Sequence, residues 1–175
     1  MKSLRYVLMT LSVLPVLALT ACYHPPTQSK IEVYETKDLS LSEAIRQNGA
    51  QIIKQGARLQ IIIPTDKFFR AQTTQVRSHQ IDTLRMIAEY LKNHLQQYQV
   101  SNVITVTGYS DTVFLKQHQY QLSRQYAEVI ASYLWNQGFS QHQIRVRGAG
   151  SSNTVANPRT APGSGANRRV IIQVG

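Results

Sequence analysis

The carboxylate of Asp111 is the first candidate for chemistry in this chain. The chain carries nine acidic residues against nineteen Lys and Arg, and Asp111 follows the β-branched run from Val103 to Thr107, which is typical of a strand. Asp111 should therefore lie in a loop at a strand end, where binding side chains are often found. An Asp in a turn can instead accept hydrogen bonds from nearby backbone amides, so a ligand-binding role and a local role both stay open.

The sequence carries no pattern typical of an active site or a metal site. It has no Gly-x-Ser-x-Gly elbow and no P-loop, and Gly148-Ala149-Gly150 runs into a polar segment rather than a helix. The histidines lack the spacing of metal ligands. They are His24, His79, His94, His118 and His142. We therefore expect a binding protein that is not an enzyme and that uses no metal or cofactor.

The N-terminal segment resembles the signal sequence of a bacterial lipoprotein. Lys2 and Arg5 precede an apolar run, residues 7–19, which is too short and wrongly flanked for a stable membrane span. Small residues then lead to Cys22, the only cysteine of the chain. The resemblance implies cleavage before Cys22 and attachment of acyl chains such as palmitate to this residue. The alternative is an ordinary signal peptide with an unrelated cysteine nearby.

The lipoprotein resemblance also implies where the protein is held. Tyr23 stands where an Asp would indicate retention in the inner membrane, so we expect a lipid anchor in the outer membrane, on its periplasmic face. Each buried CH₂ group of an acyl chain contributes about 0.8 kcal/mol, so several chains on Cys22 would make the attachment nearly permanent. The sequence then divides into a signal peptide (1–21), a lipidated tether (22–40) and one folded domain (41–175).

The formal net charge of the chain is +10. A basic surface favours an anionic partner, such as cell-wall carboxylates, lipid headgroups or an acidic protein face. Nucleic acid is not an expected partner, because the signal directs export and no nucleic-acid-binding motif occurs in the sequence.

Helical and strand patterns alternate along residues 41–175, which indicates an α/β domain with helices packed on a small sheet. Apolar residues recur at helical spacing over 81–98 and 119–137. A capping box at residues 40–43 predicts a short helix that ends at Gly49. Residues 148–166 are expected to form a polar loop. Strands are predicted at 51–54, 57–63, 103–107, 144–147 and 170–174.

Three motifs, in this order, resemble the OmpA-like peptidoglycan-binding domain. Gly108-Tyr109-Ser110-Asp111 follows a predicted strand, Leu122-Ser123 lies in the next predicted helix, and Asn167-Arg168-Arg169-Val170 precedes the last strand. The resemblance covers about residues 50–174 and implies two main helices on a small mixed sheet. It also implies a ligand, the diaminopimelate stem of peptidoglycan, which carries an ammonium group and carboxylates.

The resemblance implies that Asp111 pairs with the ligand ammonium and that an Arg on the following helix holds a carboxylate through a forked pair. This chain has Tyr126 at the position of that Arg and Gln119 where the family usually has Asn. Losing a charge-assisted pair costs about 1.5–3 kcal/mol. Arg168 or Arg169 can offset the loss. Neighbours on a strand point to opposite faces, so one of the two arginines should face the pocket. The sequence does not say which of them does, and a role in surface charge alone stays open for both.

The segment Pro64-Thr65-Asp66-Lys67-Phe68-Phe69, with the strand before it and the long helix after it, resembles the OmpA-like lipoproteins of Dot/Icm type IVB secretion core complexes. This narrower resemblance implies other secretion-complex subunits as partners. The alternative is that Phe68 and Phe69 only fill the core. Three functions stay open: an outer-membrane lipoprotein that braces a secretion assembly toward peptidoglycan, a structural subunit that has lost the wall contact, and a general wall anchor unrelated to secretion.

Overall fold

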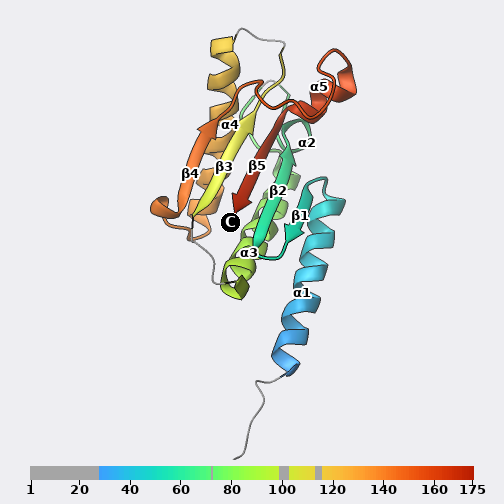
Figure 1. Ribbon diagram of the computed structural model, residues 1–175, viewed down its shortest axis with the longest axis vertical. Coiled ribbons are helices and arrows are strands. Elements are labelled where there is room, and N and C mark those ends of the chain that lie inside the picture. The colour runs from blue at the N-terminus through green and yellow to red at the C-terminus, as the bar shows by residue number, and fades with distance from the viewer. Residues whose placement is uncertain (1–27, 72, 99–102, 113–115) are drawn as a thin grey trace, which may run out of the picture.

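One mixed sheet of five strands organises the computed structural model, which describes residues 28–71, 73–98, 103–112 and 116–175. The strand order is β1-β2-β5-β3-β4; β3 and β4 run parallel, and the other neighbours are antiparallel (Figure 1). The strands are β1 (Gln51–Gln55), β2 (Arg58–Pro64), β3 (Ile104–Tyr109), β4 (Ile144–Gly148) and β5 (Arg169–Val174). The α/β class with a small mixed sheet is confirmed.

The side chains of β2 show why the sheet has a core face. Leu59, Ile61 and Ile63 are buried, and the residues between them are only partly covered. This period of two is the signature of a strand with one face against a core. The strand pairs on one side with β1, through the tight turn at Gly56. It pairs on the other side with β5, which is buried along almost its whole length.

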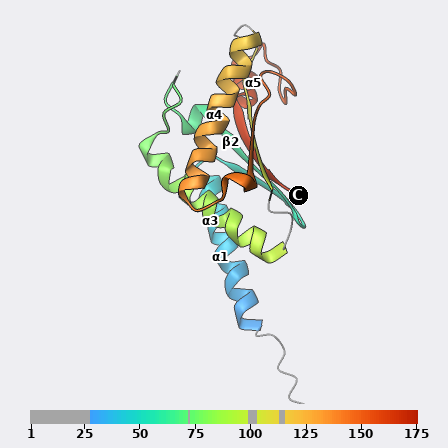
Figure 2. The ribbon, with the colours of Figure 1, turned by 90° about the vertical axis from the view of Figure 1, so that its left-hand side faces the viewer.

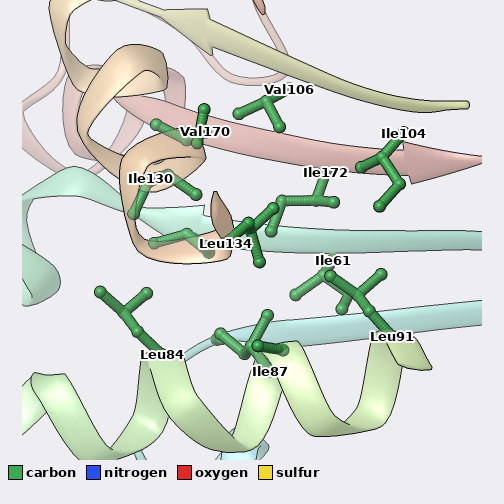
Figure 3. Close-up of a cluster of buried hydrophobic side chains, with 14 of the residues drawn as sticks. Ile61, Leu84, Ile87, Leu91, Ile104, Val106, Ile130, Leu134, Val170 and Ile172 are labelled. Carbon is green, nitrogen blue, oxygen red and sulfur yellow. The ribbon is translucent and has the colours of Figure 1, made fainter. Parts of the chain in front are cut away.

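Two long helices, α3 (Ile81–Tyr98) and α4 (Lys116–Asn136), cover one face of the sheet (Figure 2). Both confirm the helices predicted from apolar periodicity. Their buried side chains meet those of the central strands in one hydrophobic cluster (Figure 3). Members of this cluster include Leu84, Ile87 and Leu91 of α3, Ile130 and Leu134 of α4, and Ile61, Ile104, Val106, Val170 and Ile172 of the sheet.

Helix α1 (Gln28–Gln47) begins well before the capping box at residues 40–43 that was expected to start it. Residues 28–40, which were expected to belong to the tether, are therefore part of helix α1. Asn93 donates a hydrogen bond to Asp38 at 2.8 Å, and Lys37 pairs with Glu89 at 2.8 Å, so polar contacts fasten α1 to α3. The N-terminal end of α1 projects beyond the sheet (Figure 1).

The expected lipid site, Cys22, and the rest of the tether lie outside the described residues. Among the helices that are described, none is both long enough and apolar enough to cross a bilayer.

Three short helices lie in two of the connections, two of them between β2 and α3 and one between α4 and β4. They are α2 (Thr65–Phe68), η1 (Ser78–Gln80) and η2 (Gln141–Gln143). A further helix, α5 (Ala161–Asn167), occupies the end of the segment 148–166 that was expected to be a loop and extends one residue beyond it. Thr160 caps it by accepting a hydrogen bond from the backbone of Gly163 at 3.2 Å. The helix carries few apolar residues, so no apolar periodicity could predict it.

Candidate functional site

Three strand ends meet at one end of the sheet and bring the candidate residues together. Arg169, the first residue of β5, pairs with the last residue of β2 on one side and with the last residue of β3 on the other. Asp66 and Asp111 each follow one of those strand ends by two positions, and Arg168 directly precedes β5. The topology therefore places one guanidinium between two carboxylates.

Asp111 is a buried carboxylate with a cation beside it. Asp111 is 3% exposed. Arg168 donates from Nη1 to Oδ2 of Asp111 at 2.5 Å, and the hydroxyl of Ser164 donates to the same oxygen at 2.8 Å. Nη1 of Arg168 also lies 2.8 Å from the hydroxyl oxygen of Ser164. A buried charge of this kind is tolerated because it is both paired and hydrogen-bonded.

Asp66 holds the other edge of the same guanidinium. Arg168 donates from Nε to Oδ1 of Asp66 at 2.9 Å and from Nη2 to Oδ2 at 2.5 Å, which is a forked, bidentate pair. The hydrogen bonds to Asp66 raise the pKa of Arg168 above its usual value; partial burial opposes this, and Asp111 adds to it. All three guanidinium nitrogens of Arg168 are thus committed to the two carboxylates.

Tyr126, on α4, lies close enough to Asp66 and Asp111 for their charges to act on its hydroxyl. It is 8% exposed, and its ring meets the ring of Phe69 edge to face at 4.7 Å. Burial raises the pKa of Tyr126, and the negative charges of Asp66 and Asp111 raise it further. The phenol is therefore neutral at pH 7 and can add a hydrogen bond to the site but no charge.

Gln119 is buried on α4, where it contacts the loop after β4. Its Oε1 accepts a hydrogen bond from the hydroxyl of Ser151 at 2.6 Å. One turn further on, the hydroxyl of Ser123 accepts a hydrogen bond from the backbone of Gly150 at 3.0 Å. The same loop is tied to the site, since Ser110 donates its backbone N–H to Gly150 at 2.8 Å. Gln119 therefore helps to hold the loop beside Asp111.

Arg168 and Arg169 have different surroundings, which answers the question left open by the sequence. Arg169 is 3% exposed, and its guanidinium lies 4.1 Å from the ring centre of Tyr109. It donates from Nη1 to the backbone oxygen of Asn167 at 3.1 Å and from Nη2 to that of Asn153 at 3.0 Å. Burial lowers the pKa of Arg169. Arg168 is thus the arginine beside Asp111, and Arg169 supports the neighbouring loop.

Part of the motif that carries Asp111 is explained by packing. A Cβ atom added to Gly108 on β3 would lie 1.8 Å from the backbone oxygen of Ser123 on α4. Only glycine allows this approach of strand and helix. The Gly and the Ser of the two motifs therefore set how closely β3 and α4 pack, which fixes the position of Asp111 past the strand end.

Two members of the site, Asp66 and Ser164, were not assigned from the sequence. Asp66 had a usable signal, because it follows a predicted strand as Asp111 does. Ser164 had none, because its helix lies in the expected loop. Within the described part of the chain, no group of three or more His, Cys, Asp or Glu could hold a metal ion. The arrangement can accept an ammonium group at Asp111 and donate to a carboxylate from Arg168.

Sequence relatives include cell-envelope proteins. "Probable lipoprotein YiaD" of Escherichia coli is 28% identical over 138 residues, which are 79% of this chain and 61% of YiaD. "Peptidoglycan-binding protein ArfA" of Mycobacterium tuberculosis is 37% identical over 71 residues, which are 41% of this chain and 22% of ArfA. The matched region thus spans less than two thirds of the length of either relative.

A solved structure shares the fold over most of the chain. The cell wall anchor of the type VI secretion system from Pseudomonas aeruginosa superposes with a TM-score of 0.64 and 25% identity, over 77% of this chain and 92% of that one. The family model described as "OmpA family" matches residues 68–168, which include Asp111, Tyr126 and Arg168 and exclude Asp66. That match covers more than half of the sequence, and the chain therefore belongs to the OmpA family.

Proposed function

We propose that this protein binds peptidoglycan through the end of the sheet that carries Asp111. The observation that carries the proposal is the pairing of the buried Asp111 carboxylate with Arg168, in a chain of the OmpA family. The sequence relative ArfA is called a peptidoglycan-binding protein, and the structurally similar protein of the type VI secretion system is called a cell wall anchor. The ligand is the diaminopimelate stem, and the protein acts by binding rather than by catalysis.

The existing ion pair suggests how the stem is held. The ligand ammonium takes the place of Nη1 of Arg168 on Asp111, and the released guanidinium edge donates to a ligand carboxylate. Asp66 keeps its two hydrogen bonds to the other edge of Arg168, so the guanidinium stays in place during the exchange. One intramolecular ion pair is replaced by two pairs with the ligand, which supports net binding.

In this scheme Arg168 supplies the charge that Tyr126 lacks. The phenol of Tyr126 stays neutral, lies within the field of both carboxylates, and is held by Phe69. It can donate one hydrogen bond to the same ligand carboxylate. The scheme explains how a chain without the usual Arg on α4 keeps a cation at the site.

A sedimentation assay with purified peptidoglycan tests the proposal. The wild type should sediment with the wall polymer, and Asp111→Ala should lose most of its recovery. Asp82→Ala is the matched control, because Asp82 is an exposed acid on α3 that pairs with Arg85. Equal recovery of wild type and Asp111→Ala would remove Asp111 from the mechanism. Failure of the wild type to sediment would remove the proposal itself.

We further propose that the lipid on Cys22 anchors the protein in the outer membrane, on its periplasmic face, and that the protein braces a secretion assembly toward the wall. The resemblance of the Pro64–Phe69 region to secretion lipoproteins supports the assembly role, as does the similarity to a secretion-system wall anchor. Affinity isolation from envelopes after digestion of peptidoglycan tests it. Recovery of stable secretion subunits supports the role, and recovery of the protein alone contradicts it.

A further inference from the structure

Asp66 also lines a polar groove of about 350 Å³, formed where the end of α1, helix α2 and the 3₁₀ helix η1 meet. Lys67, Arg77 and His79 contribute basic side chains to this groove. The carboxylate of Asp66 is shared with the neighbouring site through its bidentate pair with Arg168. A single guanidinium therefore separates the groove from Asp111.

Lys67 and Arg77 of the groove have no acidic partner among the residues that the structure describes. Asp66 is the acid that lines it, and the carboxylate of Asp66 is already bound by Arg168. Among the described residues, neither Lys67 nor Arg77 has a carboxylate within ion-pair distance. Arg77 makes a long hydrogen bond, 3.4 Å, to the backbone oxygen of Asp66. The groove therefore offers positive charge to an anionic group from outside.

The backbone that carries these cations is fixed by the core. Arg77 donates its backbone N–H to Phe68 at 2.8 Å, and Phe69 forms a bridge with Val76. Both phenylalanines are almost fully buried. The segment from α2 to η1 thus folds back on itself around two anchored aromatic residues, which holds Arg77 beside Asp66.

The floor of the groove is equally constrained. Gln80 is 5% exposed and donates from Nε2 to the backbone oxygen of Asn48 at 3.1 Å, which joins η1 to the end of α1. Gly49 has a φ of +94°, and a Cβ atom there would lie 2.7 Å from Cδ of Lys67. The glycine thus leaves room for the Lys67 stem to cross the end of α1, with its ammonium over the groove.

We propose that this groove binds a second carboxylate of the wall peptide whose ammonium group is held by Asp111. The inference rests on the proposed function and deepens it. The carboxylate is one that a stem peptide carries next to diaminopimelate, the α-carboxylate of its D-glutamate. Lys67 and Arg77 pair with this group, and the peptide crosses Arg168 between the two sites. Lys67 and Arg77 thus add positive charge on the far side of Asp66, beyond the charge that Arg168 supplies in place of an Arg at position 126.

Two synthetic tripeptides test the inference by isothermal titration calorimetry. One is L-Ala-γ-D-Glu-meso-diaminopimelate, and the other carries an amide in place of the glutamate α-carboxylate. The wild type should bind the first about five- to ten-fold more tightly, since an exposed charge pair contributes up to about 1 kcal/mol and two cations contribute here. Lys67→Gln/Arg77→Gln should bind both peptides equally, near the level of the amidated one.

The control variant is Arg145→Gln, which removes one exposed cation from β4 at the opposite edge of the sheet and should keep the preference. Circular dichroism checks that each variant folds, and Lys67→Gln alone replaces the double variant if that one does not. Equal binding of both peptides by the wild type overturns this inference and leaves the proposed function standing. A preference that survives in the groove variant also overturns it. Binding of neither peptide by the wild type overturns the proposed function and the inference with it.

Discussion

Arg168 donates from Nη1 to the buried carboxylate of Asp111 at 2.5 Å and holds the second carboxylate, Asp66, through its other two nitrogens. The three charged side chains therefore sum to −1 before any ligand arrives. An ammonium group on Asp111 takes the place of Nη1 of Arg168, and the released Nη1 edge can then donate to a carboxylate of the same ligand. This arrangement favours a zwitterionic group such as the free end of diaminopimelate.

Replacing Arg168 by Gln should weaken both binding and folding. The ligand loses its cation, which should lower affinity for the diaminopimelate tripeptide by about ten-fold or more. Asp111 loses its charged partner, which should lower the free energy of unfolding by about 1–3 kcal/mol. Calorimetry with the tripeptide and urea unfolding measure the two effects. Arg145→Gln is the control, and wild-type affinity in Arg168→Gln would contradict the proposed exchange.

Tyr126→Arg restores the charge that the usual family pattern has on α4. The new guanidinium would lie near Asp66 and Asp111, which already raise the pKa of the phenol now there. Recovery in the peptidoglycan sedimentation assay should rise several-fold. Tyr126→Phe, which removes only the hydroxyl, should fall slightly below wild type. If binding by Tyr126→Arg is unchanged or reduced, the pocket is not built like that of its relatives.

His94 should make the stability of the domain depend on pH. The residue is 1% exposed, with Nε2 at 2.9 Å from the backbone oxygen of Ala57. Burial lowers the pKa of His94 below its usual value of 6.5. The unfolded chain therefore binds the proton more readily, so the free energy of unfolding should fall as pH drops from about 7 to the lowered pKa. Each pH unit in this window costs at most about 1.4 kcal/mol.

Urea unfolding of wild type and His94→Gln between about pH 7 and pH 5 checks this dependence. Gln keeps a donor for the oxygen of Ala57 and removes the titration, so the variant should lose less stability over this range. His142→Gln is the control, because His142 is exposed on η2. An identical pH dependence in wild type and His94→Gln would assign the effect to other groups.

The central sheet and the long helices could be predicted because their signals are local. Apolar spacing located α3 over residues 81–98, and β-branched runs located the strands within one or two residues. Elements without an apolar face could not be predicted in this way. The middle of α1 is fastened by polar contacts such as Asn93 to Asp38, and α5 depends on the cap at Thr160. The first kind of contact joins residues that are distant in sequence, and the second depends on the local backbone conformation.

The site could be predicted only in part. Strand-end position placed Asp111 in its loop. The expectation that Arg168 and Arg169 point apart did not choose between them, and it treated both as strand residues, whereas Arg168 lies just before β5. Choosing required the strand order β2-β5-β3, which sets Arg168 between two strand ends. Asp66 entered the site for the same reason. The pairing of distant strands is not encoded in any short stretch of sequence.

Lipid attachment can be tested directly on the full-length chain. Cys22→Ser should abolish incorporation of labelled palmitate and release the protein from the membrane fraction, because acyl chains supply the anchor. Tyr23→Asp is a matched variant, which should keep the label and, in an enteric host, move from the outer-membrane to the inner-membrane fraction. Palmitate labelling that survives in Cys22→Ser would contradict the predicted anchor. Sucrose-gradient fractionation reports the location.

The close approach of β3 and α4 predicts a large effect of a single methyl group. Gly108→Ala places a Cβ atom 1.8 Å from the backbone oxygen of Ser123, and neither backbone can yield without moving a strand or a helix. The free energy of unfolding should fall by about 3 kcal/mol, the upper range for overpacking. Gly165→Ala on α5 is the control, since its nearest contact would be 3.4 Å and alanine favours the helix. Similar stabilities of the two variants in urea would show that β3 and α4 have room to separate. Because β3 positions Asp111, this carboxylate would then be less firmly placed than its hydrogen bonds indicate.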